Sequence, residues 1–263
     1  KYGGSAMTDE ALKSGVAQDI VLMHYVGVRP IVVHGGGPKI THMMERLGKK
    51  AEFVKGLRVT DADTMEIAQM VLVGTINKEI VSAINLAGGR AVGLSGKDAN
   101  LIRAHKRPSG TEADLGFVGD VDDIEAQVLD DLEASGYIAV VSSVGIGPDG
   151  ASYNINADHV AGKLAAAVGA EKLVSLTDVP GILRDPDDPG SLISKLSLDE
   201  ARDLLAAEAV GAGMVPKLES AVMALEGGVP RAHIIDGRVP HSLLMEVLTQ
   251  AGIGTMVEAS QQT

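Results

Sequence analysis

The sequence predicts an α/β protein with a mainly parallel sheet that helices cover on both faces. Two observations predict it: short β-branched runs end at glycine-rich turns, and segments with helical spacing of apolar residues follow them. The first such unit runs from a strand at 30–34 through three consecutive glycines to a helix that opens at Pro38 and continues to Leu47. Strands that alternate with helices are typical of parallel sheets buried on both faces.

The same alternation continues along the chain. We expect strands at 137–143, 172–176 and 232–236, and helices at 157–168 and about 241–250. The segment 88–121 differs, because short predicted strands at 90–94, 101–105 and 117–121 are separated by polar turns. We expect this whole segment to form a hairpin excursion from the main sheet.

One predicted helix, at about 63–86, is apolar on more than one side. A helix that is apolar nearly all round is usually buried nearly all round. Two interpretations stay open: a central core helix, or a helix at an interface between subunits.

The composition excludes several classes of protein. The chain has 263 residues, of which 45% are hydrophobic and 22% are charged, as in soluble globular proteins. It has no cysteine, which excludes disulfides, zinc–thiolate sites, iron–sulfur clusters and cysteine nucleophiles. The net charge of −12 and the 2% of aromatic residues argue against nucleic-acid binding.

The apolar runs and the first residues bear on the compartment. No apolar run approaches about 18 uninterrupted residues, so we expect no membrane span. No signal peptide is visible, and we expect a cytoplasmic protein. The chain begins with Lys1 and not with methionine, so we expect it to lack the N-terminal segment of the natural protein.

The glycines at 35–37 are a candidate anion site. They lie between a predicted strand and a predicted helix, where unobstructed backbone N–H groups suit a phosphate. A tight packing turn is the alternative interpretation. We expect the preceding His34 to be structural.

Two other glycine-rich stretches are weaker signals. The loop 1–7 places Lys1 before two glycines, which suits a polyphosphate, although a surface lysine gives the same pattern. The stretch 145–150 matches G-x-G-x-x-G, but its third glycine lies in a turn and opens no helix, so we expect no nicotinamide cofactor. No Walker-type phosphate loop is present, so we do not expect a Walker-type NTPase. No H-E-x-x-H or close histidine pair is present either, so we expect no metal site made by protein residues.

Three further polar features each have a structural and a functional interpretation. Asn154, Asn156 and Asp158 lie at the start of a predicted helix, where they would cap it or recognise a polar ligand. Arg58 lies between apolar neighbours, where it would grip a carboxylate or form a surface ion pair. Lys217 lies in the first turn of a predicted helix, and because a cation there opposes the helix dipole, a functional role is favoured.

Six motifs, in this order, resemble the amino acid kinase family, and within it the N-acetyl-L-glutamate kinases. They are Lys1-Tyr2-Gly3-Gly4, Val33-His34-Gly35-Gly36-Gly37, Gly56-Leu57-Arg58-Val59-Thr60, Asn154-Ile155-Asn156-Ala157-Asp158, Leu176-Thr177-Asp178-Val179-Pro180-Gly181 and Gly213-Met214-Val215-Pro216-Lys217. The resemblance covers essentially the whole chain and implies a three-layer αβα sandwich around a mainly parallel sheet. It also implies a substrate lobe at 1–170 and an ATP-binding lobe at 171–263, joined by one continuous sheet.

The resemblance also implies a reaction. This is the ATP-dependent phosphorylation of the γ-carboxylate of N-acetyl-L-glutamate to N-acetyl-L-glutamyl 5-phosphate, the second step of arginine biosynthesis. A sibling kinase acting on acetylaminoadipate, aspartate or glutamate stays open, as does a regulatory homologue that only binds ligand. A carboxylate acceptor is already ionised at neutral pH, so the reaction needs lysines and backbone N–H groups and no general base.

By resemblance, Lys1 and Lys217 stabilise the phosphoryl transition state and Asp158 holds both lysines in place. The other implied contacts are Gly36, Gly37, Arg58 and Asn154 for the substrate and the transferring phosphoryl group, and Gly3, Gly4, Thr177, Asp178, Gly213 and Met214 for the nucleotide. We expect Mg²⁺ to arrive with ATP, bound mainly by its phosphates.

The C-terminal pattern resembles that of the arginine-inhibited branch of the family. The implied inhibitor is L-arginine, and its implied site contains His241, Glu246 and Gly252. The alternative is that Glu246 is a solvated helix residue and that the glycines only turn the chain into its last strand. The family's first strand and N-terminal helix are expected to precede Lys1, so a homodimer and a trimer of dimers both stay open.

Overall fold

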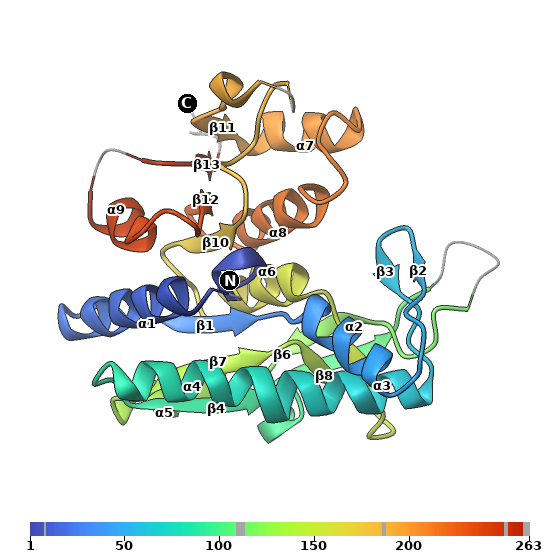
Figure 1. Ribbon diagram of the computed structural model, residues 1–263. Coiled ribbons are helices and arrows are strands. Elements are labelled where there is room, and N and C mark those ends of the chain that lie inside the picture. Colours follow the sequence, from blue (N-terminus) through green and yellow to red (C-terminus); the bar gives the residue numbers. More distant parts are fainter. Residues whose placement is uncertain (8, 109–113, 186–187, 250–251, 260–263) are drawn as a thin grey trace. The chain divides into compact units, whose positions relative to one another are not determined.

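The computed structural model describes residues 1–7, 9–108, 114–185, 188–249 and 252–259, which form an α/β architecture (Figure 1). The described chain divides into two compact units. Unit 1 comprises residues 1–30, 86–89 and 158–263, and unit 2 comprises residues 31–85 and 90–157. This division differs from the single boundary near residue 170 that the sequence predicts.

The N-terminal segment belongs to unit 1 because its backbone pairs with strand β10 (Leu173–Thr177). The backbone nitrogen of Lys1 donates to Val174 O at 2.7 Å, and Leu176 N donates to Lys1 O at 3.0 Å. Two bonds in this pattern are those of a parallel ladder. The assignment of one lobe to the substrate and one to the nucleotide, on one continuous sheet, stays a prediction.

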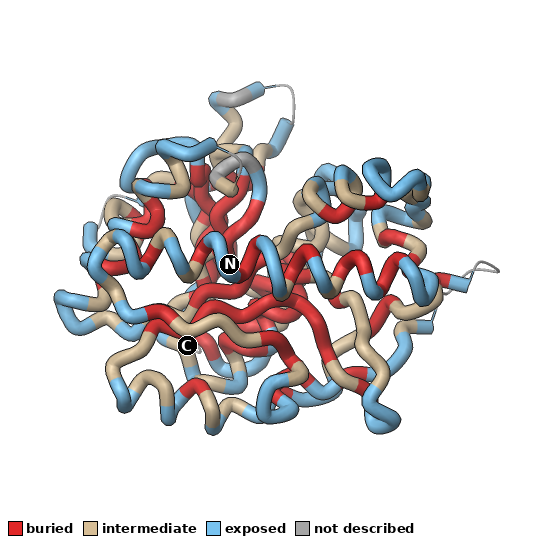
Figure 2. The backbone as a smooth tube through the Cα atoms, turned by 60° about the horizontal axis from the view of Figure 1, so that its bottom comes forward, coloured by how far each residue is buried: buried red, intermediate tan, exposed pale blue. Residues whose placement is uncertain are grey.

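The core of unit 2 contains a three-stranded parallel sheet. Its strands are β1 (Ile31–His34), β7 (Ile138–Ser142) and β4 (Ala91–Ser95), with β7 in the middle. Both outer strands run parallel to β7. Every residue of β7 is buried. Figure 2 draws the buried residues of the chain in red. A continuous buried run is typical of a parallel strand covered on both faces.

Strand β4 corrects one prediction. The sequence predicts that 90–94 belongs to a hairpin excursion, which is wrong because β4 lies in the main parallel sheet. The excursion begins later, with a four-stranded sheet of β5 (Ile102–Lys106), β6 (Gly119–Ile124), β8 (Val144–Ile146) and β9 (Ser152–Asn154). Gly150 lies in the turn between β8 and β9 at φ 82°, so the G-x-G-x-x-G stretch opens no helix, as predicted.

The described part of unit 2 has five short elements besides these sheets and the long helix at 62–86. They are α2 (Gly37–Arg46), the short hairpin β2 (Phe53–Val54) and β3 (Leu57–Arg58), the single turn η3 (Asp98–Asn100) and α5 (Gln127–Ala134).

The predicted helix at 63–86 is continuous from Ala62 to Leu86. It consists of α3 (Ala62–Gln69), a π-helical segment η2 (Met70–Ile76) and α4 (Asn77–Leu86). Among the described residues it is the one helix long and apolar enough to cross a membrane, a test that core helices of soluble proteins also pass. Leu72 and Ile76 are each 1% exposed, which favours the core interpretation for that face of the helix.

Unit 1 is built on a four-stranded sheet in the order β10–β12–β13–β11. Strand β12 (Arg231–Asp236) is parallel to β10 and antiparallel to β13 (Thr255–Glu258), and β13 is parallel to β11 (Lys195–Ser197). The helices are η1 (Gly4–Met7), α1 (Glu10–Tyr25), α6 (Ala157–Ala167), η4 (Pro189–Ser191), α7 (Leu198–Ala206), α8 (Val215–Glu226) and α9 (Ser242–Leu248). The elements predicted from residue 157 onward are therefore confirmed, except that residue 250, the last of the predicted helix at about 241–250, lies outside the described residues.

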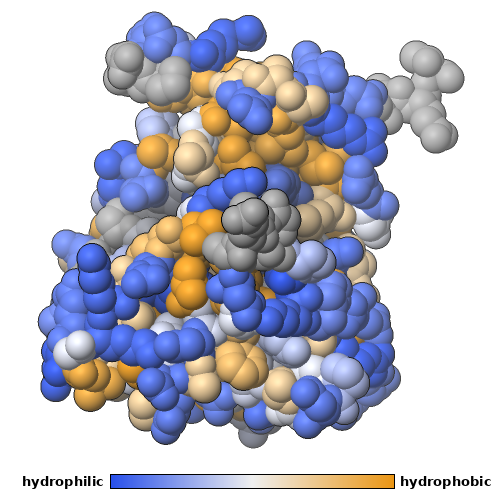
Figure 3. Space-filling model, turned by 90° about the vertical axis from the view of Figure 1, so that its right-hand side faces the viewer, coloured by the Kyte–Doolittle hydropathy of each residue, from blue (hydrophilic) through white to orange (hydrophobic). Residues whose placement is uncertain are grey.

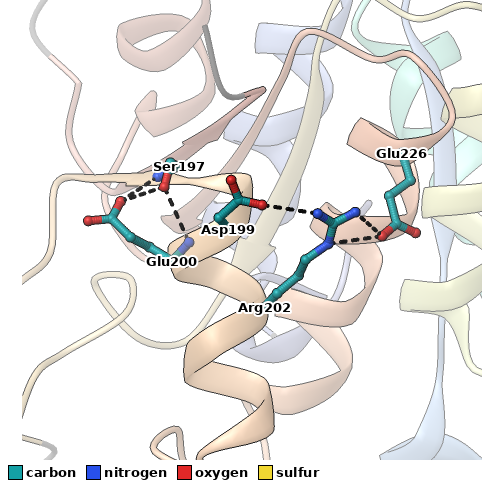
Figure 4. Close-up of polar contacts among 5 residues, drawn as sticks. All are labelled: Ser197, Asp199, Glu200, Arg202 and Glu226. Atoms are coloured by element: carbon teal, nitrogen blue, oxygen red, sulfur yellow. Dashed lines mark hydrogen bonds and ion pairs between the residues drawn. The ribbon is translucent and has the colours of Figure 1, made fainter. Parts of the chain in front are cut away.

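Helix α7 begins with a capping box (Figure 4). The Ser197 hydroxyl accepts a hydrogen bond from Glu200 N, and the Glu200 carboxylate accepts one from Ser197 N. Further along, Arg202 bridges Asp199 and Glu226, which joins α7 to α8. Exposed ion pairs of this kind add little to the free energy of unfolding. Figure 3 shows that hydrophilic residues cover much of one face of the molecule.

Helices α6 and α8 approach closely at Gly162. A β-carbon at this position would lie 2.7 Å from Ser220 O. Ser220 Oγ donates to Asp158 O at 2.6 Å, and His159 Nε2 lies 2.8 Å from Glu219 Oε2. These contacts fix the first turn of α6 against the first turns of α8.

We predict that Gly162→Ala lowers the free energy of unfolding by about 1–3 kcal/mol, because the added methyl group overlaps the backbone of Ser220. Gly15→Ala is the matched control, since Gly15 lies inside α1 and its β-carbon position has no neighbour within 4 Å. This control should leave stability unchanged or raise it by up to about 1 kcal/mol through helix propensity. Urea unfolding measures both variants, and equal stabilities would contradict the packing argument.

Candidate functional site

Two lysines and a buried carboxylate form an ion cluster in unit 1. Lys1 Nζ lies 2.9 Å from Asp158 Oδ1, and Lys217 Nζ lies 3.9 Å from Asp158 Oδ2. The side chains of Lys1 and Asp158 are only 9% and 8% exposed. The interpretation of Lys1 as a surface lysine is therefore wrong. The structure brings together three residues that the sequence singles out from distant positions.

Each member of the cluster is held at the end of an element. Lys1 is fixed by its backbone pairing with β10, Asp158 lies in the first turn of α6, and Lys217 lies in the first turn of α8. The Lys217 ammonium also donates to Gly213 O at 3.0 Å. A helix N-terminus favours the anion Asp158 and disfavours the cation Lys217, so the neighbouring carboxylate offsets the unfavourable placement of the lysine.

The charges in the cluster shift the pKa of Asp158 and that of Lys217. Burial alone would raise the pKa of the Asp158 carboxyl, but Lys1 and Lys217 together hold it below its ordinary value. Burial lowers the pKa of the Lys217 ammonium, and the charge of Asp158 opposes that shift. The cluster combines two lysines with one carboxylate, and its excess of positive charge suits a phosphate ligand.

The glycines after Lys1 make room for this arrangement. A β-carbon at Gly3 would lie 2.8 Å from Lys1 Nζ, so the lysine side chain folds back over position 3, where a larger residue would displace its end. Gly4 has φ 68°, a left-handed conformation that favours glycine, and its β-carbon position lies 3.4 Å from Asp178 N. The loop after Lys1 is thus next to the end of β10.

The other predicted nucleotide residues also lie in unit 1. Thr177 ends β10, where its buried hydroxyl donates to Val179 O at 2.8 Å and accepts from Val179 N at 3.1 Å. Asp178 is exposed. Its charge raises the pKa of the Lys217 ammonium, against the lowering that burial causes. Gly213 and Met214 lead into α8.

Gly36 and Gly37 form the N-terminus of α2 in unit 2. A β-carbon at Gly36 would lie 2.2 Å from Ile76 Cδ1 and 2.9 Å from Leu72 Cδ2, so the π-helical segment packs directly against this loop. Gly37 is exposed, with no atom within 4 Å of its β-carbon position. Backbone N–H groups at a helix N-terminus are favourable partners for an anion.

Arg58 is buried beside this glycine loop. Its guanidinium donates to Gly37 O at 2.9 Å and to Thr41 Oγ1 at 2.8 Å, and it lies 4.7 Å from the centre of the Phe53 ring. Burial lowers the pKa of Arg58. Within the described part of the chain no carboxylate is paired with it, so the surface ion-pair interpretation is wrong.

Asn154 ends β9, and its side-chain amide donates to Thr60 Oγ1 at 3.3 Å. Its backbone nitrogen donates to Phe117 O at 2.8 Å. The half-buried amide therefore has a defined orientation on the same unit as Arg58 and the glycine loop.

The predicted inhibitor residues lie around α9 in unit 1. Glu246 is 5% exposed; its carboxylate lies 2.5 Å from His233 Nδ1 and accepts from Ile253 N at 2.8 Å. The interpretation of Glu246 as a solvated residue is therefore wrong. His241 precedes α9, and its Nδ1 lies 2.6 Å from Asp19 Oδ1. A β-carbon at Gly252 would lie 3.5 Å from Glu246 Oε1, so this glycine is next to the glutamate.

Sequence reasoning did not single out Ser220 or Asn77. Both are fully buried polar residues whose partners lie far away in the chain. Their types are common inside helices, so no local pattern distinguishes them. Buried polar groups need hydrogen-bond partners, and these partners are known only once the fold is known.

Comparison with known proteins identifies the family. The model of the amino acid kinase family matches residues 1–236. The acetylglutamate kinase of Pelotomaculum thermopropionicum is 57% identical over 266 residues, which cover 98% of this chain and 90% of that protein. The acetylglutamate kinase of Nostoc sp. is 57% identical over 261 residues, with 99% and 87% covered.

A solved structure extends the comparison. N-acetylglutamate synthase from Neisseria gonorrhoeae, complexed with coenzyme A and N-acetyl-glutamate, superposes with a TM-score of 0.84 at 29% identity, covering 98% of this chain and 58% of that chain. The same synthase with coenzyme A and L-arginine gives a TM-score of 0.80 at 27% identity, with 97% and 59% covered. With a family model that matches most of its length and relatives above half identity, the chain belongs to the amino acid kinase family.

Proposed function

We propose that this chain transfers the γ-phosphoryl group of ATP to the γ-carboxylate of N-acetyl-L-glutamate, as the acetylglutamate kinases that it resembles are named for doing. The observation that carries the proposal is the Lys1–Asp158–Lys217 cluster. Phosphoryl transfer to an anion requires positively charged groups of this kind, held in place. The product is an acyl phosphate in the biosynthesis of arginine, and the reaction takes place in the cytoplasm.

The chemistry is a direct displacement. A carboxylate oxygen of the acceptor forms a bond to the γ-phosphorus, and the bond from that phosphorus to the β–γ bridging oxygen breaks, releasing ADP. Because the acceptor carboxylate is ionised at neutral pH, no proton has to be removed. Both reactants are anions, so the main task is to stabilise negative charge on the transferring group and the leaving oxygen.

The lysines perform that task in the proposal. The ammonium groups of Lys1 and Lys217 stabilise the developing charge, and Asp158 holds them in position. The Gly3–Gly4 backbone covers the phosphates, while Thr177, Asp178, Gly213 and Met214 border the nucleotide.

Unit 2 supplies the contacts to the acceptor in the proposal. The N–H groups of Gly36 and Gly37 bind the transferring phosphoryl group. The guanidinium of Arg58 binds the carboxylate that does not react, and the amide of Asn154 binds the acetamido group. A buried guanidinium that has no carboxylate partner among the described residues is well suited to a carboxylate ligand, because the two groups match as parallel forks.

We propose that Mg²⁺ comes with the nucleotide. In the part of the chain that the structure describes, no three His, Cys, Asp or Glu side chains are grouped as a metal cage. Mg²⁺ usually keeps several waters and binds substrate phosphates together with one or two carboxylates. The exposed carboxylate of Asp178 at the end of β10 is a suitable single ligand.

We propose that the native assembly is a homodimer or a trimer of dimers. Met70, in the π-helical segment, is 51% exposed and lines a cavity of about 580 Å³ together with Met65, Val73 and Phe117. A second copy of the chain would cover the exposed Met70 and the other apolar residues of this lining, which also includes Glu66, Gln69 and Ser152. Sedimentation of the full-length protein distinguishes the two assemblies, and a monomer at micromolar concentration would contradict both.

The function is tested by trapping the product. Hydroxylamine converts an acyl phosphate to a hydroxamate, so the chain is incubated with ATP, Mg²⁺ and one candidate acid at a time. N-acetyl-L-glutamate should give the fastest hydroxamate formation. If acetylaminoadipate, aspartate or glutamate is faster, the chain is one of the sibling kinases.

The same assay distinguishes an active kinase from a regulatory homologue that only binds ligand. The synthase relative shows that chains of this fold also occur within longer proteins with another activity, since this chain spans 58% of it. The complete Lys1–Asp158–Lys217 cluster favours catalysis. Binding of N-acetyl-L-glutamate without any hydroxamate would support a purely regulatory role.

We predict that Lys217→Ala and Lys1→Ala each lower kcat about 100-fold or more while changing the affinity for ATP far less, because both act on charge that develops in the transition state. Lys163→Ala is the matched control, since Lys163 is an exposed lysine on α6. Steady-state kinetics and nucleotide titration measure the two effects. An unchanged kcat for Lys217→Ala would remove that residue from the mechanism.

We predict that Arg58→Ala mainly raises the KM for the acceptor, by roughly 10- to 100-fold, since a buried charge-assisted contact is worth about 1.5–3 kcal/mol. Arg90→Ala is the matched control, because Arg90 lies 4.2 Å from the centre of the Tyr137 ring much as Arg58 lies over Phe53. Initial rates across acceptor concentrations separate the parameters. A loss confined to kcat would contradict a role in binding.

We further propose that L-arginine inhibits the full-length enzyme at a site that includes His241, Glu246 and Gly252. The buried carboxyl group of Glu246 beside this glycine supports the proposal, as does the L-arginine bound by the related synthase. We predict that arginine titration inhibits the full-length enzyme and that Glu246→Ala abolishes the response. Inhibition that survives the substitution would contradict the site, and no inhibition at millimolar arginine would contradict the regulation.

A further inference from the structure

A buried polar chain in unit 2 connects the long helix to the glycine loop. Asn77 is the first residue of α4, directly after the π-helical segment, and His34 is the last residue of β1. Asn77 Nδ2 lies 3.2 Å from His34 Nε2, and His34 Nδ1 lies 3.0 Å from Gly35 O. Both side chains have an exposed fraction of 0%.

The hydrogen-bond partners determine which ring nitrogen of His34 carries the proton. A carbonyl oxygen only accepts, so Nδ1 must donate to Gly35 O, and Nε2 of the neutral ring is left as an acceptor. Asn77 Nδ2 donates to it and also donates to Val140 O at 2.9 Å. A protonated ring would place an Nε2–H against the Asn77 amide. Burial, the largest cause, lowers the pKa of His34 to about 4, which agrees with a neutral ring.

The bond from His34 fixes the direction of the next N–H group. In a planar trans peptide, the C=O and the N–H point in opposite directions. When Gly35 O points toward the His34 ring, the N–H of Gly36 points away from that ring. Gly36 is the residue directly before α2, so its N–H is one of the donors at that helix N-terminus.

Two glycines allow the chain of contacts to form. A β-carbon at Gly93 of β4 would lie 1.8 Å from Asn77 Oδ1, so the sheet leaves room for the amide only because this residue is glycine. A β-carbon at Gly36 would lie 2.2 Å from Ile76 Cδ1. Two successive residues thus connect the long helix to the loop: Ile76, which ends the π-helical segment and packs against Gly36, and Asn77, which begins α4 and acts through His34.

We propose that Asn77 and His34 are positioning residues that hold the Gly35–Gly36 peptide with the Gly36 N–H aimed at the transferring phosphoryl group. Asn77 keeps His34 in the Nδ1–H tautomer, and His34 keeps the peptide oriented. The proposal rests on the proposed function, since it presumes that the glycine loop binds a phosphoryl group. Neither side chain touches substrate; both act through the backbone.

A merely structural role for His34 predicts different behaviour. Any substitution would then destabilise unit 2, and activity would fall only as far as the protein unfolds. A positioning role instead predicts a loss of kcat at nearly unchanged stability and KM, because a donor aimed at developing charge acts in the transition state.

The test is a matched pair of variants in the full chain, His34→Asn and His34→Gln. The Asn amide can place an N–H where Nδ1–H lies, whereas the longer Gln amide reaches the place of Nε2. We expect His34→Asn to keep kcat within a few-fold of wild type. We expect His34→Gln to lose about 10-fold or more in kcat. The KM for ATP, the KM for the acceptor and the melting temperature should stay close to those of His34→Asn.

A second measurement separates phosphoryl recognition from folding. MgADP with aluminium fluoride mimics the transferring group, so the factor by which fluoroaluminate tightens ADP binding should fall in His34→Gln and stay near wild type in His34→Asn. Equal behaviour of the two variants, whether both active or both impaired, would overturn the positioning role. A wild-type chain that forms no hydroxamate with any acceptor would instead overturn the proposed function, and the positioning role with it.

Discussion

The carboxylate of Asp158 between two lysines is the interaction on which the site in unit 1 depends. Without it, Lys1 and Lys217 would be two cations of low exposure near one another and near a helix N-terminus. Each of those circumstances disfavours a protonated lysine. The carboxylate makes the arrangement stable and still leaves the cluster with more positive than negative groups. The same excess of charge makes it suitable for phosphates.

Several backbone features exist to support this cluster. Lys1 is held by two hydrogen bonds to β10, so its side chain starts from a fixed point. Gly3 lets that side chain fold back, and Gly162 lets α8 approach α6 closely enough for Ser220 to bond Asp158 O. In unit 2, glycines at 36 and 93 serve the loop at α2 in the same way. Glycine in this protein therefore often marks a close approach between elements.

Much of the fold could be predicted from the sequence, because buried parallel strands and helices of regular spacing have strong local patterns. The strands near Val140 and Leu176 and the helix after Ala157 are examples. The sequence predicts the strand at 91–95 but not the sheet to which it belongs, since its length and polar neighbours resemble those of a hairpin and only its partner β7 reveals its place. The π-helical turn at 70–76 also leaves no local signature.

The site residues also differ in whether the sequence predicts them. Lys1, Asp158 and Lys217 could be named because their motifs match a family, and the structure brings them together. Asn77 and Ser220 could not, because their roles are defined by partners about 40 to 60 positions away, His34 and Asp158. The burial of Glu246 was also missed, because its partner His233 lies on a different element, β12.

The central claim is that Lys1 and Lys217 act on the same developing charge as one unit held by Asp158. A double-mutant cycle on kcat, with Lys1→Ala, Lys217→Ala and the double variant, tests it most directly. Residues that act as a unit are strongly non-additive, so the double variant should lose little more than the worse single variant. A loss equal to the product of the two single losses would contradict the account, because it would show two independent contributions.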